Sequence, residues 1–270
     1  MIEYRSIGKT FVDGTEAVGD FSLRLPSRTT TVFVGSSGCG KTTLLRMVNR
    51  MVDPTKGQVL IDDVDIATRD KVQLRRSIGY VMQNAGLLPH RTVIDNIGTV
   101  LRLNGVGKAE ARERSLAILP TVGLSEKEAD RYPAQLSGGQ QQRVGVARGL
   151  VTDPNILLMD EPFGAVDPIV RDELQQELLR LQRELDKTIV FVTHDIDEAF
   201  LLGDQVVILR TGGRIAQIGS PADIIAHPAD DFVRSFVGLD KGARSLHVED
   251  RDGVRVVVDG TGKATGVLES

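Results

Sequence analysis

Two short runs of residues have the composition and spacing of anion-binding loops, and the first lies near the start of the chain. Residues 35–42, Gly-Ser-Ser-Gly-Cys-Gly-Lys-Thr, fit the pattern G-x-x-x-x-G-K-[ST]. The glycines allow backbone N–H groups to converge on phosphates, and a following helix N-terminus adds positive potential. Lys41 can then reach the β- and γ-phosphates, and the Thr42 hydroxyl suits Mg²⁺. The run therefore predicts a nucleoside-triphosphate site.

The residues of this run predicted to contact the nucleotide are small or carry a group that reaches a phosphate. They are Gly35, Ser36, Ser37, Gly38, Cys39, Gly40, Lys41, Thr42 and Thr43. Cys39 is expected to fill space within the loop. It is the only cysteine of the chain, which rules out an internal disulfide and fits a reducing compartment.

The second run is Leu-Ser-Gly-Gly-Gln at residues 136–140, and it precedes a helical pattern at 141–148. Ser137 suits the N-cap of that helix, while the glycine amides and the helix N-terminus suit an anion. A glycine turn that only caps a helix is the alternative. The complete phrase, beside the first run, favours a second phosphate grip formed by Ser137, Gly138, Gly139 and Gln140.

Two neighbouring carboxylates, Asp160 and Glu161, follow an apolar run at 156–159 that predicts a buried strand. Open α/β folds bind ligands at the carboxyl edge of the sheet, where this strand would deliver both acids. Asp160 is predicted to hold Mg²⁺ through water, and Glu161 to polarise the attacking water as general base. A solvated acidic turn is the alternative, and the apolar residues directly before the pair argue against it.

The elements that must position these groups follow from the apolar pattern. Strands are predicted at residues 30–34, 58–62, 78–83, 156–159 and 188–193, the last two without polar alternation, as expected for strands covered on both faces. Residues 42–48 have helical spacing. The stretch 92–151 is mostly helical, which predicts a helical subdomain inserted into an α/β core. A helical stripe is expected to pack in the core and comprises Leu174, Leu178, Leu181 and Leu185.

The composition suits one large or two smaller globular domains. The 270 residues are 41% hydrophobic and 26% charged, with a formal net charge of −4. No basic bias argues for a nucleic-acid surface. Residues 1–5 begin no signal peptide, and no apolar run approaches the ~20 residues of a membrane span. The chain is therefore expected in the cytosol, and a membrane role would require a separate partner.

With these motifs in this order, the chain resembles the ATP-binding cassette (ABC) ATPases over about residues 1–240. The resemblance implies a P-loop NTPase (RecA-like) α/β core with an N-terminal antiparallel β subdomain and an inserted α-helical subdomain. It also implies roles for three further residues. Gln83 matches the Q-loop glutamine that binds Mg²⁺ and water, Asp167 matches the D-loop aspartate, and His194 matches the switch histidine that contacts the γ-phosphate.

An aromatic residue near the N-terminus is expected to stack on adenine. Phe11 matches the aromatic position of the family, where tyrosine is commoner, and stacking needs only a π-face. Tyr4 is the competing candidate.

In the family two cassettes bind head to tail, with each ATP between the Lys41-type loop of one chain and the Ser137-type loop of the other. The resemblance therefore implies ATP and Mg²⁺ as cofactors and a second ATPase subunit, expected to be a copy of the same chain. It also implies transmembrane permease subunits and, indirectly, an extracytoplasmic substrate-binding protein. The chain would then lie peripherally on the cytoplasmic side of the cell membrane.

Residues 78–93, 161–171 and 230–233 resemble the subfamily that imports glycine betaine, choline, carnitine and similar osmoprotectants. None of these residues would touch the solute, which binds other subunits, so the solute is implied by resemblance alone. An importer of another small solute, such as an amino acid, and a soluble regulatory ATPase without a permease stay open as alternatives.

The tail, residues 241–270, is short, β-like and punctuated by glycine and aspartate. Residues 256–268 resemble part of a cystathionine-β-synthase-like (CBS-like) regulatory module, which often follows the ATPase in that subfamily. A pair of such modules needs far more chain. A vestigial strand and a docking strand are therefore both open.

Overall fold

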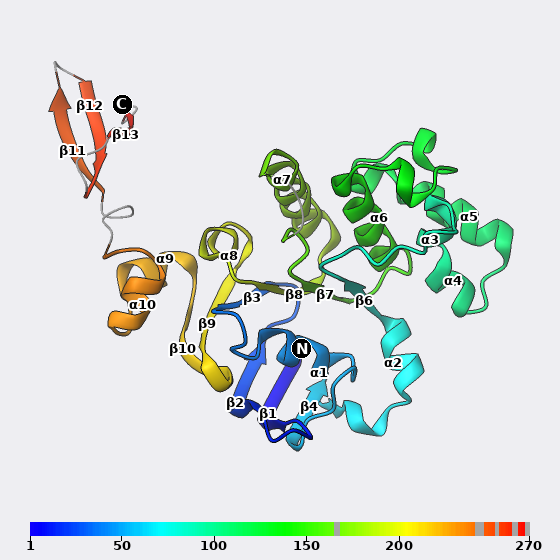
Figure 1. The fold of residues 1–270 in the computed structure, drawn as a ribbon, viewed down its shortest axis with the longest axis horizontal. Helices are drawn as coiled ribbons and strands as arrows, with labels where there is room; N and C mark the ends of the chain where they lie inside the picture. Colours follow the sequence, from blue (N-terminus) through cyan, green and yellow to red (C-terminus); the bar gives the residue numbers. More distant parts are fainter. Residues whose placement is uncertain (165–167, 241–245, 252–253, 261–263, 268–270) are drawn as a thin grey trace.

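A six-stranded sheet forms the centre of the computed structural model, which describes residues 1–164, 168–240, 246–251, 254–260 and 264–267 (Figure 1). In spatial order its strands are β10 (Arg214–Gly219), β9 (Gln205–Arg210), β3 (Thr30–Gly35), β8 (Thr188–Thr193), β7 (Ile156–Asp160) and β6 (Ile78–Val81). All neighbours from β9 to β6 are parallel, and β10 is an antiparallel edge strand. The predicted α/β class is confirmed.

The strands β3, β7 and β8 are buried along their whole length, as their unbroken apolar pattern predicts. Successive residues of β7 point to opposite faces, so Leu157 packs in one apolar cluster and Leu158 in the other. The predicted strand 78–83 ends earlier, at Val81, because the carbonyl of Met82 accepts a hydrogen bond from the side chain of Gln142 instead of continuing the ladder.

One face of the central sheet packs with helix α1 and with a four-stranded antiparallel sheet of strand order β2–β1–β4–β5. These elements are α1 (Lys41–Val48), β1 (Ile2–Thr10), β2 (Glu16–Leu25), β4 (Lys56–Ile61) and β5 (Val64–Asp65). Their core contains Tyr4 edge-on to Phe21, with ring centroids 5.2 Å apart. Tyr4 is 1% exposed and donates its hydroxyl to the carbonyl of Leu44, so it cannot stack on a bound adenine.

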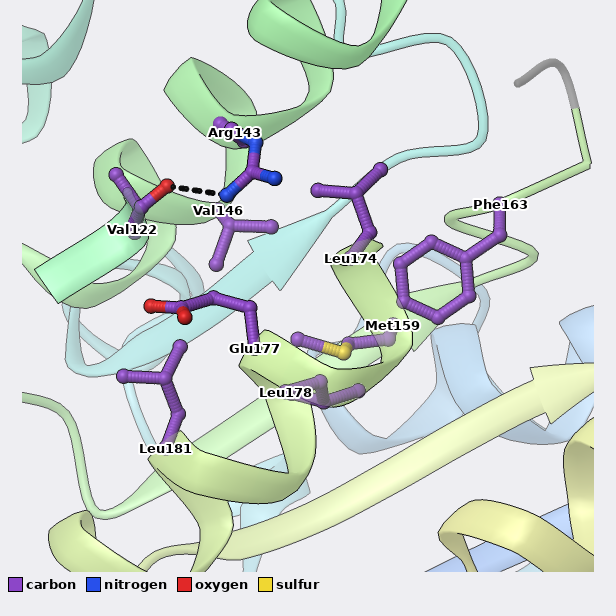
Figure 2. Close-up of a pocket in the computed structure, with 9 residues that line it drawn as sticks. All are labelled: Val122, Arg143, Val146, Met159, Phe163, Leu174, Glu177, Leu178 and Leu181. Atoms are coloured by element: carbon purple, nitrogen blue, oxygen red, sulfur yellow. Dashed lines mark hydrogen bonds between the residues drawn. The ribbon is translucent and has the colours of Figure 1, made fainter. Parts of the chain in front are cut away.

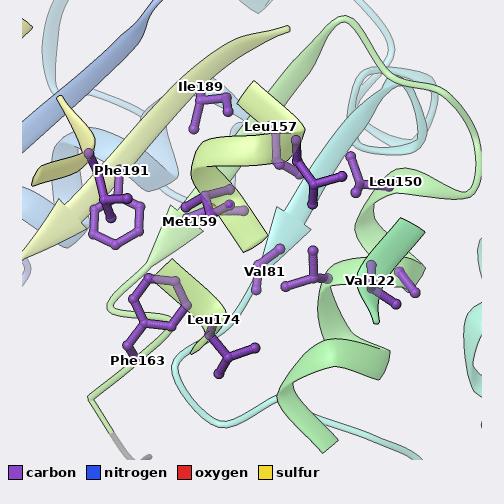
Figure 3. Packing of buried hydrophobic residues seen from close by; sticks show 14 of the residues in the cluster. Val81, Val122, Leu150, Leu157, Met159, Phe163, Leu174, Ile189 and Phe191 are labelled. Atoms are coloured by element: carbon purple, nitrogen blue, oxygen red, sulfur yellow. The ribbon is translucent and has the colours of Figure 1, made fainter. Parts of the chain in front are cut away.

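The other face is covered by α6 (Gly138–Leu150), α7 (Pro168–Leu185) and α8 (Ile196–Leu202). Leu174, Leu178 and Leu181 are buried in this layer, as predicted for the helical stripe, while the side chain of Leu185 lies outside the described residues. Figure 3 shows the packing of this layer, in which the Phe163 and Phe191 rings lie 5.7 Å apart between their centroids.

Helices also fill the chain between β6 and β7, where the described residues form no strand. They are α3 (Val93–Ile97), α4 (Thr99–Leu103), α5 (Lys108–Ala117), the 3₁₀ turns η2 (Pro120–Val122), η3 (Glu126–Glu128) and η4 (Pro133–Gln135), and then α6. Elsewhere lie η1 (Ile66–Thr68), α2 (Lys71–Ser77), η5 (Thr211–Gly213), α9 (Pro221–Ala226) and α10 (Asp231–Phe236). The domain boundaries expected at 92–151 and at 240 remain predictions.

The tail forms a separate three-stranded antiparallel sheet, which Figure 1 shows apart from the central sheet. Its strands are β11 (Leu246–Arg251), β12 (Val254–Asp259) and β13 (Ala264–Val267). Leu246 and Val248 are exposed apolar residues of β11. Among the described helices of the whole chain, none combines the length and the apolar character that a bilayer span requires.

Candidate nucleotide-binding and hydrolysis site

The predicted site residues converge because parallel strands place their carboxyl ends at one edge of the sheet. β3 ends at Gly35 and continues into the phosphate loop, and β6 ends two residues before Gln83. β7 ends at Asp160 and β8 at Thr193, so Glu161 and His194 each follow a strand end. The register pairs Asp160 with Val192, which brings the two strand ends level.

The loop between β3 and α1 can be built only with glycine at two positions. Gly40, the N-cap of α1, has φ 107°, and a Cβ there would lie 2.7 Å from the carbonyl oxygen of Ala17. A Cβ on Gly35 would lie 2.5 Å from the carbonyl oxygen of Leu209. The loop therefore lies tight against its neighbours and leads directly into a helix N-terminus, which favours bound anions.

Lys41 is buried, and its ammonium donates to the carbonyl oxygens of Gly35 at 2.7 Å and Ser36 at 3.0 Å. The ammonium thus lies inside the curve of the loop, where phosphate oxygens would arrive. Cys39 is buried in the apolar cluster beneath, as its predicted space-filling role requires, and burial raises the pKa of its thiol. Only the backbone of Cys39 is therefore available to a phosphate.

A pocket of about 270 Å³ opens over this loop. Its lining residues are Ala17, Ser37, Gly38, Gly40, Lys41, Thr42, Thr43 and Glu161. The phosphate-loop residues and the predicted general base thus share one cavity.

The carboxylate of Asp160 is nearly buried and is held through both of its oxygens. Thr42 Oγ1 donates to Oδ1 at 2.8 Å. On the other side, Tyr80 donates its hydroxyl to Oδ2 at 2.9 Å and Arg46 donates Nη2 to Oδ2 at 3.1 Å. The Thr42 hydroxyl and the Asp160 carboxylate provide two neighbouring oxygens of the kind that Mg²⁺ prefers.

Arg46 and Tyr80 were not among the residues singled out from the sequence. The spacing of four residues between Thr42 and Arg46 on α1 was the available signal, since such residues lie on one helix face. The contact of Tyr80 with Asp160 depends on β6 lying beside β7, and strand order is not visible in the sequence.

Glu161 is the meeting point of the three residues predicted to act in catalysis. Its Oε2 lies 3.3 Å from the donating Nε2 of Gln83 and 3.2 Å from Nδ1 of His194. The Glu161 carboxylate is 21% exposed and the His194 ring 61% exposed. The backbone N–H of Glu161 donates to Val192, which fixes the residue at the strand end.

The second grip is the N-terminus of α6. Ser137 is its N-cap and forms a capping box with Gln140, in which each side chain accepts from the backbone N–H of the other. Ser137 and Gly138 are exposed. None of the residues 137–140 lines the phosphate pocket, so within one chain the two grips are separate.

Two further predicted residues stay predictions. Phe11 is 41% exposed in the turn between β1 and β2, with the Lys9 ammonium 5.3 Å from its ring centroid, and it does not line the phosphate pocket. Asp167 lies outside the described residues.

A second pocket, between α6 and α7, lacks the groups that phosphate binding needs. Figure 2 shows its mostly apolar lining, with the charged ends of Arg143 and Glu177 at the edge. Arg143 Nη1 donates to the carbonyl of Val122 at 3.0 Å and Nη2 pairs with Glu173. This pocket is a gap in the packing of the helical layer.

Several known proteins are similar to this chain in sequence or in structure. The family model described as "ABC transporter" matches residues 18–164. The "Carnitine transport ATP-binding protein OpuCA" of Listeria monocytogenes is 48% identical over 89% of this chain and 60% of its own length. The "Glycine betaine uptake system ATP-binding protein YehX" of Escherichia coli is 45% identical over 91% and 80%.

The chain spans less than two thirds of the length of several curated relatives, OpuCA among them. A solved structure, "Dimeric structure of a post-hydrolysis state of the ATP-binding cassette MJ0796 bound to ADP and Pi", superimposes with a TM-score of 0.74. It is 33% identical, and the match covers 82% of this chain and 99% of that one. The chain belongs to the ABC transporter family, and its fold is that of the ABC ATPase cassette.

Proposed function

We propose that this chain is the ATP-hydrolysing subunit of an ABC importer. It energises the uptake of a quaternary-amine osmoprotectant, of the glycine betaine, choline or carnitine type, through a separate transmembrane permease. The observation that carries the hydrolytic assignment is the meeting of Gln83 and His194 at Glu161, beside the phosphate loop. The solute class is supported by relatives named for carnitine and glycine betaine transport.

The phosphate loop binds the triphosphate by exchanging partners. The Lys41 ammonium gives up the carbonyl oxygens of Gly35 and Ser36 for the β- and γ-phosphate oxygens, which carry more negative charge. Backbone N–H groups from Ser36 to Thr43 and the N-terminus of α1 complete the cradle. Phe11 stacks on the adenine at the mouth of the site.

Thr42, Asp160 and Gln83 would hold Mg²⁺. Thr42 and Asp160 lie within a hydrogen bond of each other, and Gln83 keeps a carbonyl oxygen free while its Nε2 donates to Glu161. When bound, Mg²⁺ neutralises charge that develops on the phosphates. No cluster of three or more His, Cys, Asp or Glu ligands occurs among the described residues, so these oxygens would act together with the nucleotide and water.

Glu161 is the general base, because its carboxylate lines the same pocket as the phosphate loop. Gln83 and His194 both contact Oε2 of that carboxylate, and these contacts hold it in position. The exposed His194 ring also reaches toward the γ-phosphate. Catalysis is then positioning and charge stabilisation, without a covalent intermediate.

Two copies of the chain close head to tail on ATP. Ser137 Oγ accepts from the Gln140 N–H, so its hydroxyl proton is left to donate to the γ-phosphate in the facing chain. Gly138, Gly139, Gln140 and Asp167 complete this trans contact. The separation of the two grips within one chain supports the arrangement, as does the dimeric MJ0796 structure.

The chain works at the cytoplasmic face of the membrane, bound peripherally to permease subunits, with an extracytoplasmic binding protein delivering the solute. The test is ATP turnover by the assembled transporter with its binding protein, on addition of glycine betaine, choline, carnitine or proline. Stimulation by a quaternary amine is expected. Stimulation by proline alone would point to an amino-acid importer, and turnover that is indifferent to every solute and to the permease would contradict the transport role.

A further inference from the structure

Asp160 is held on the side that faces away from Thr42 by two residues to which the proposed hydrolysis assigns no part. We infer that Arg46 and Tyr80 are positioning residues that fix the Asp160 carboxylate with Oδ1 facing Thr42 and the Mg²⁺ site. The inference rests on the proposed function, because the metal is part of it.

Helix α1 approaches Asp160 with two side chains of the same face. Thr42 and Arg46 are four residues apart, one turn of helix, so their side chains lie one above the other. Thr42 Oγ1 donates to Oδ1 at 2.8 Å, and Arg46 Nη2 donates to Oδ2 at 3.1 Å. Because the two side chains are one helical turn apart, each of them contacts a different oxygen of the carboxylate.

Tyr80 approaches from the neighbouring strand. β6 pairs in parallel with β7, with Tyr80 opposite Leu158, so Tyr80 and Asp160 lie on the same face of the sheet. The Tyr80 hydroxyl donates to Oδ2 at 2.9 Å and accepts from Arg46 Nε at 3.3 Å. Arg46, Tyr80 and Oδ2 therefore form a closed ring of three hydrogen bonds.

The two oxygens of Asp160 carry unequal numbers of hydrogen bonds. Oδ2 accepts from two donors, one of them cationic, while Oδ1 accepts from one neutral hydroxyl and keeps a second lone pair for Mg²⁺ or for a water bound to it. Arg46 is 44% exposed, so solvent screens much of its attraction, and its main contribution is orientation rather than stability. Contacts of this kind behind a metal ligand tune metal affinity.

The experiment measures Mg²⁺ dependence without turnover. In a Glu161→Gln background, ATP binding is followed by calorimetry across a Mg²⁺ series and in EDTA, and bound Mn²⁺ by electron paramagnetic resonance. Tyr80→Phe removes only the hydroxyl and is expected to raise the half-saturating Mg²⁺ about 10-fold, with a changed Mn²⁺ spectrum and unchanged ATP binding in EDTA. Arg46→Met should act likewise, and Arg46→Lys should restore part of the loss.

Tyr4→Phe is the matched control. It removes another buried hydroxyl that bonds α1, at the carbonyl of Leu44, without touching Asp160. It should lower thermal stability and leave the Mg²⁺ series unmoved.

Mg²⁺ half-saturation within about twofold of the parent in both Tyr80→Phe and Arg46→Met would overturn the inference, as would an equal shift in Tyr4→Phe. Because Arg46 is partly exposed, its variants keep the test decisive if Tyr80→Phe folds poorly. If ATP binding by the parent Glu161→Gln protein did not depend on Mg²⁺, the metal assignment of the proposed function would be wrong, and this inference would be wrong with it.

Discussion

Glu161 has a backbone conformation that residues other than glycine seldom adopt. Its φ is 46°, in the left-handed region, directly after the buried strand β7. Such strain persists where surrounding contacts determine it, and here the N–H bond to Val192 and the contacts of the carboxylate do so. The strained turn lifts the carboxylate off the sheet edge and into the phosphate pocket.

Glu161→Gln is therefore expected to reduce ATP turnover at least about 100-fold, because the amide cannot take a proton from water. ATP binding should survive, and an ATP-bound dimer should accumulate. Phosphate release and size-exclusion chromatography with ATP would measure both effects. Glu173→Gln, an exposed change outside the pocket, is the control, and turnover equal to that control would refute the assignment of the base.

Site residues could be predicted from the sequence where the residues that act together lie next to one another in the chain. The phosphate loop and the Asp160–Glu161 pair each lie within one run, so strand and helix signals beside them were enough. Gln83 and His194 were assigned only through resemblance to a family. Their meeting at Glu161 depends on β6, β7 and β8 being neighbours, which no local pattern encodes.

Ser137 caps the N-terminus of α6, and in the proposed function it also faces a second chain. Ser137→Arg removes the cap, at a cost of about 1 kcal/mol, and places a bulky cation where the facing ATP would dock. Turnover and ATP-dependent dimerisation should be lost. ATP binding to the single chain, followed by calorimetry, should be retained, because Ser137 does not line the pocket.

Ser125→Arg is the matched control, since Ser125 also forms a capping box, with Glu128, on an exposed turn. It should lose similar stability and keep dimerisation. If ATP binding to the isolated chain collapsed in Ser137→Arg but not in this control, the role of Ser137 across the dimer would be wrong.

Helices α7 and α8 are joined through a buried carboxyl. Glu198 accepts from Gln175 Nε2 at 3.1 Å, and burial raises the pKa of Glu198 above its ordinary value of 4.5. The folded chain thus binds this proton more tightly than the unfolded chain. The protonated Glu198 carboxyl therefore makes its full contribution to the free energy of unfolding below pH 4.5. This contribution is lost as the pH rises through the raised pKa.

Glu198→Gln should therefore raise the melting temperature more at pH 8 than at pH 5, as measured by thermal unfolding at both values. Glu113→Gln, on the exposed face of α5, should show no such difference. A Glu198→Gln effect of equal size at both pH values would rule out the buried charge as its cause.

At the scale of the whole chain, the sequence predicted the buried strands but not their arrangement. Apolar runs mark β7 and β8 because both faces of each are covered. The order β10–β9–β3–β8–β7–β6 follows from which helices cross which face, and the packing between distant segments decides it. The edge strand β10, half-buried along much of its length, carried no comparable signal.

The tail is expected to be dispensable for the stability and the hydrolytic activity of the cassette. Val233 and Val237 are the last buried apolar residues of the cassette before residue 240. Figure 1 shows strands β11–β13 apart from the central sheet. A chain ending at Asp240 should melt within about 2 °C of the full chain and turn over ATP at the same rate. A clear loss of either property would show that the tail contacts the cassette, as a docking strand would.

The burial of Cys39 makes the protein suited to site-directed labelling. A thiol reacts as its thiolate. Because Cys39 is buried and burial raises the pKa of its thiol, maleimide probes should not react with it. Because it is the only cysteine, a second one introduced on the surface would carry a fluorophore or spin label uniquely, without any need to alter the phosphate loop. Distances between two such labels, one in each copy, could then follow the closing of the cassette in real time.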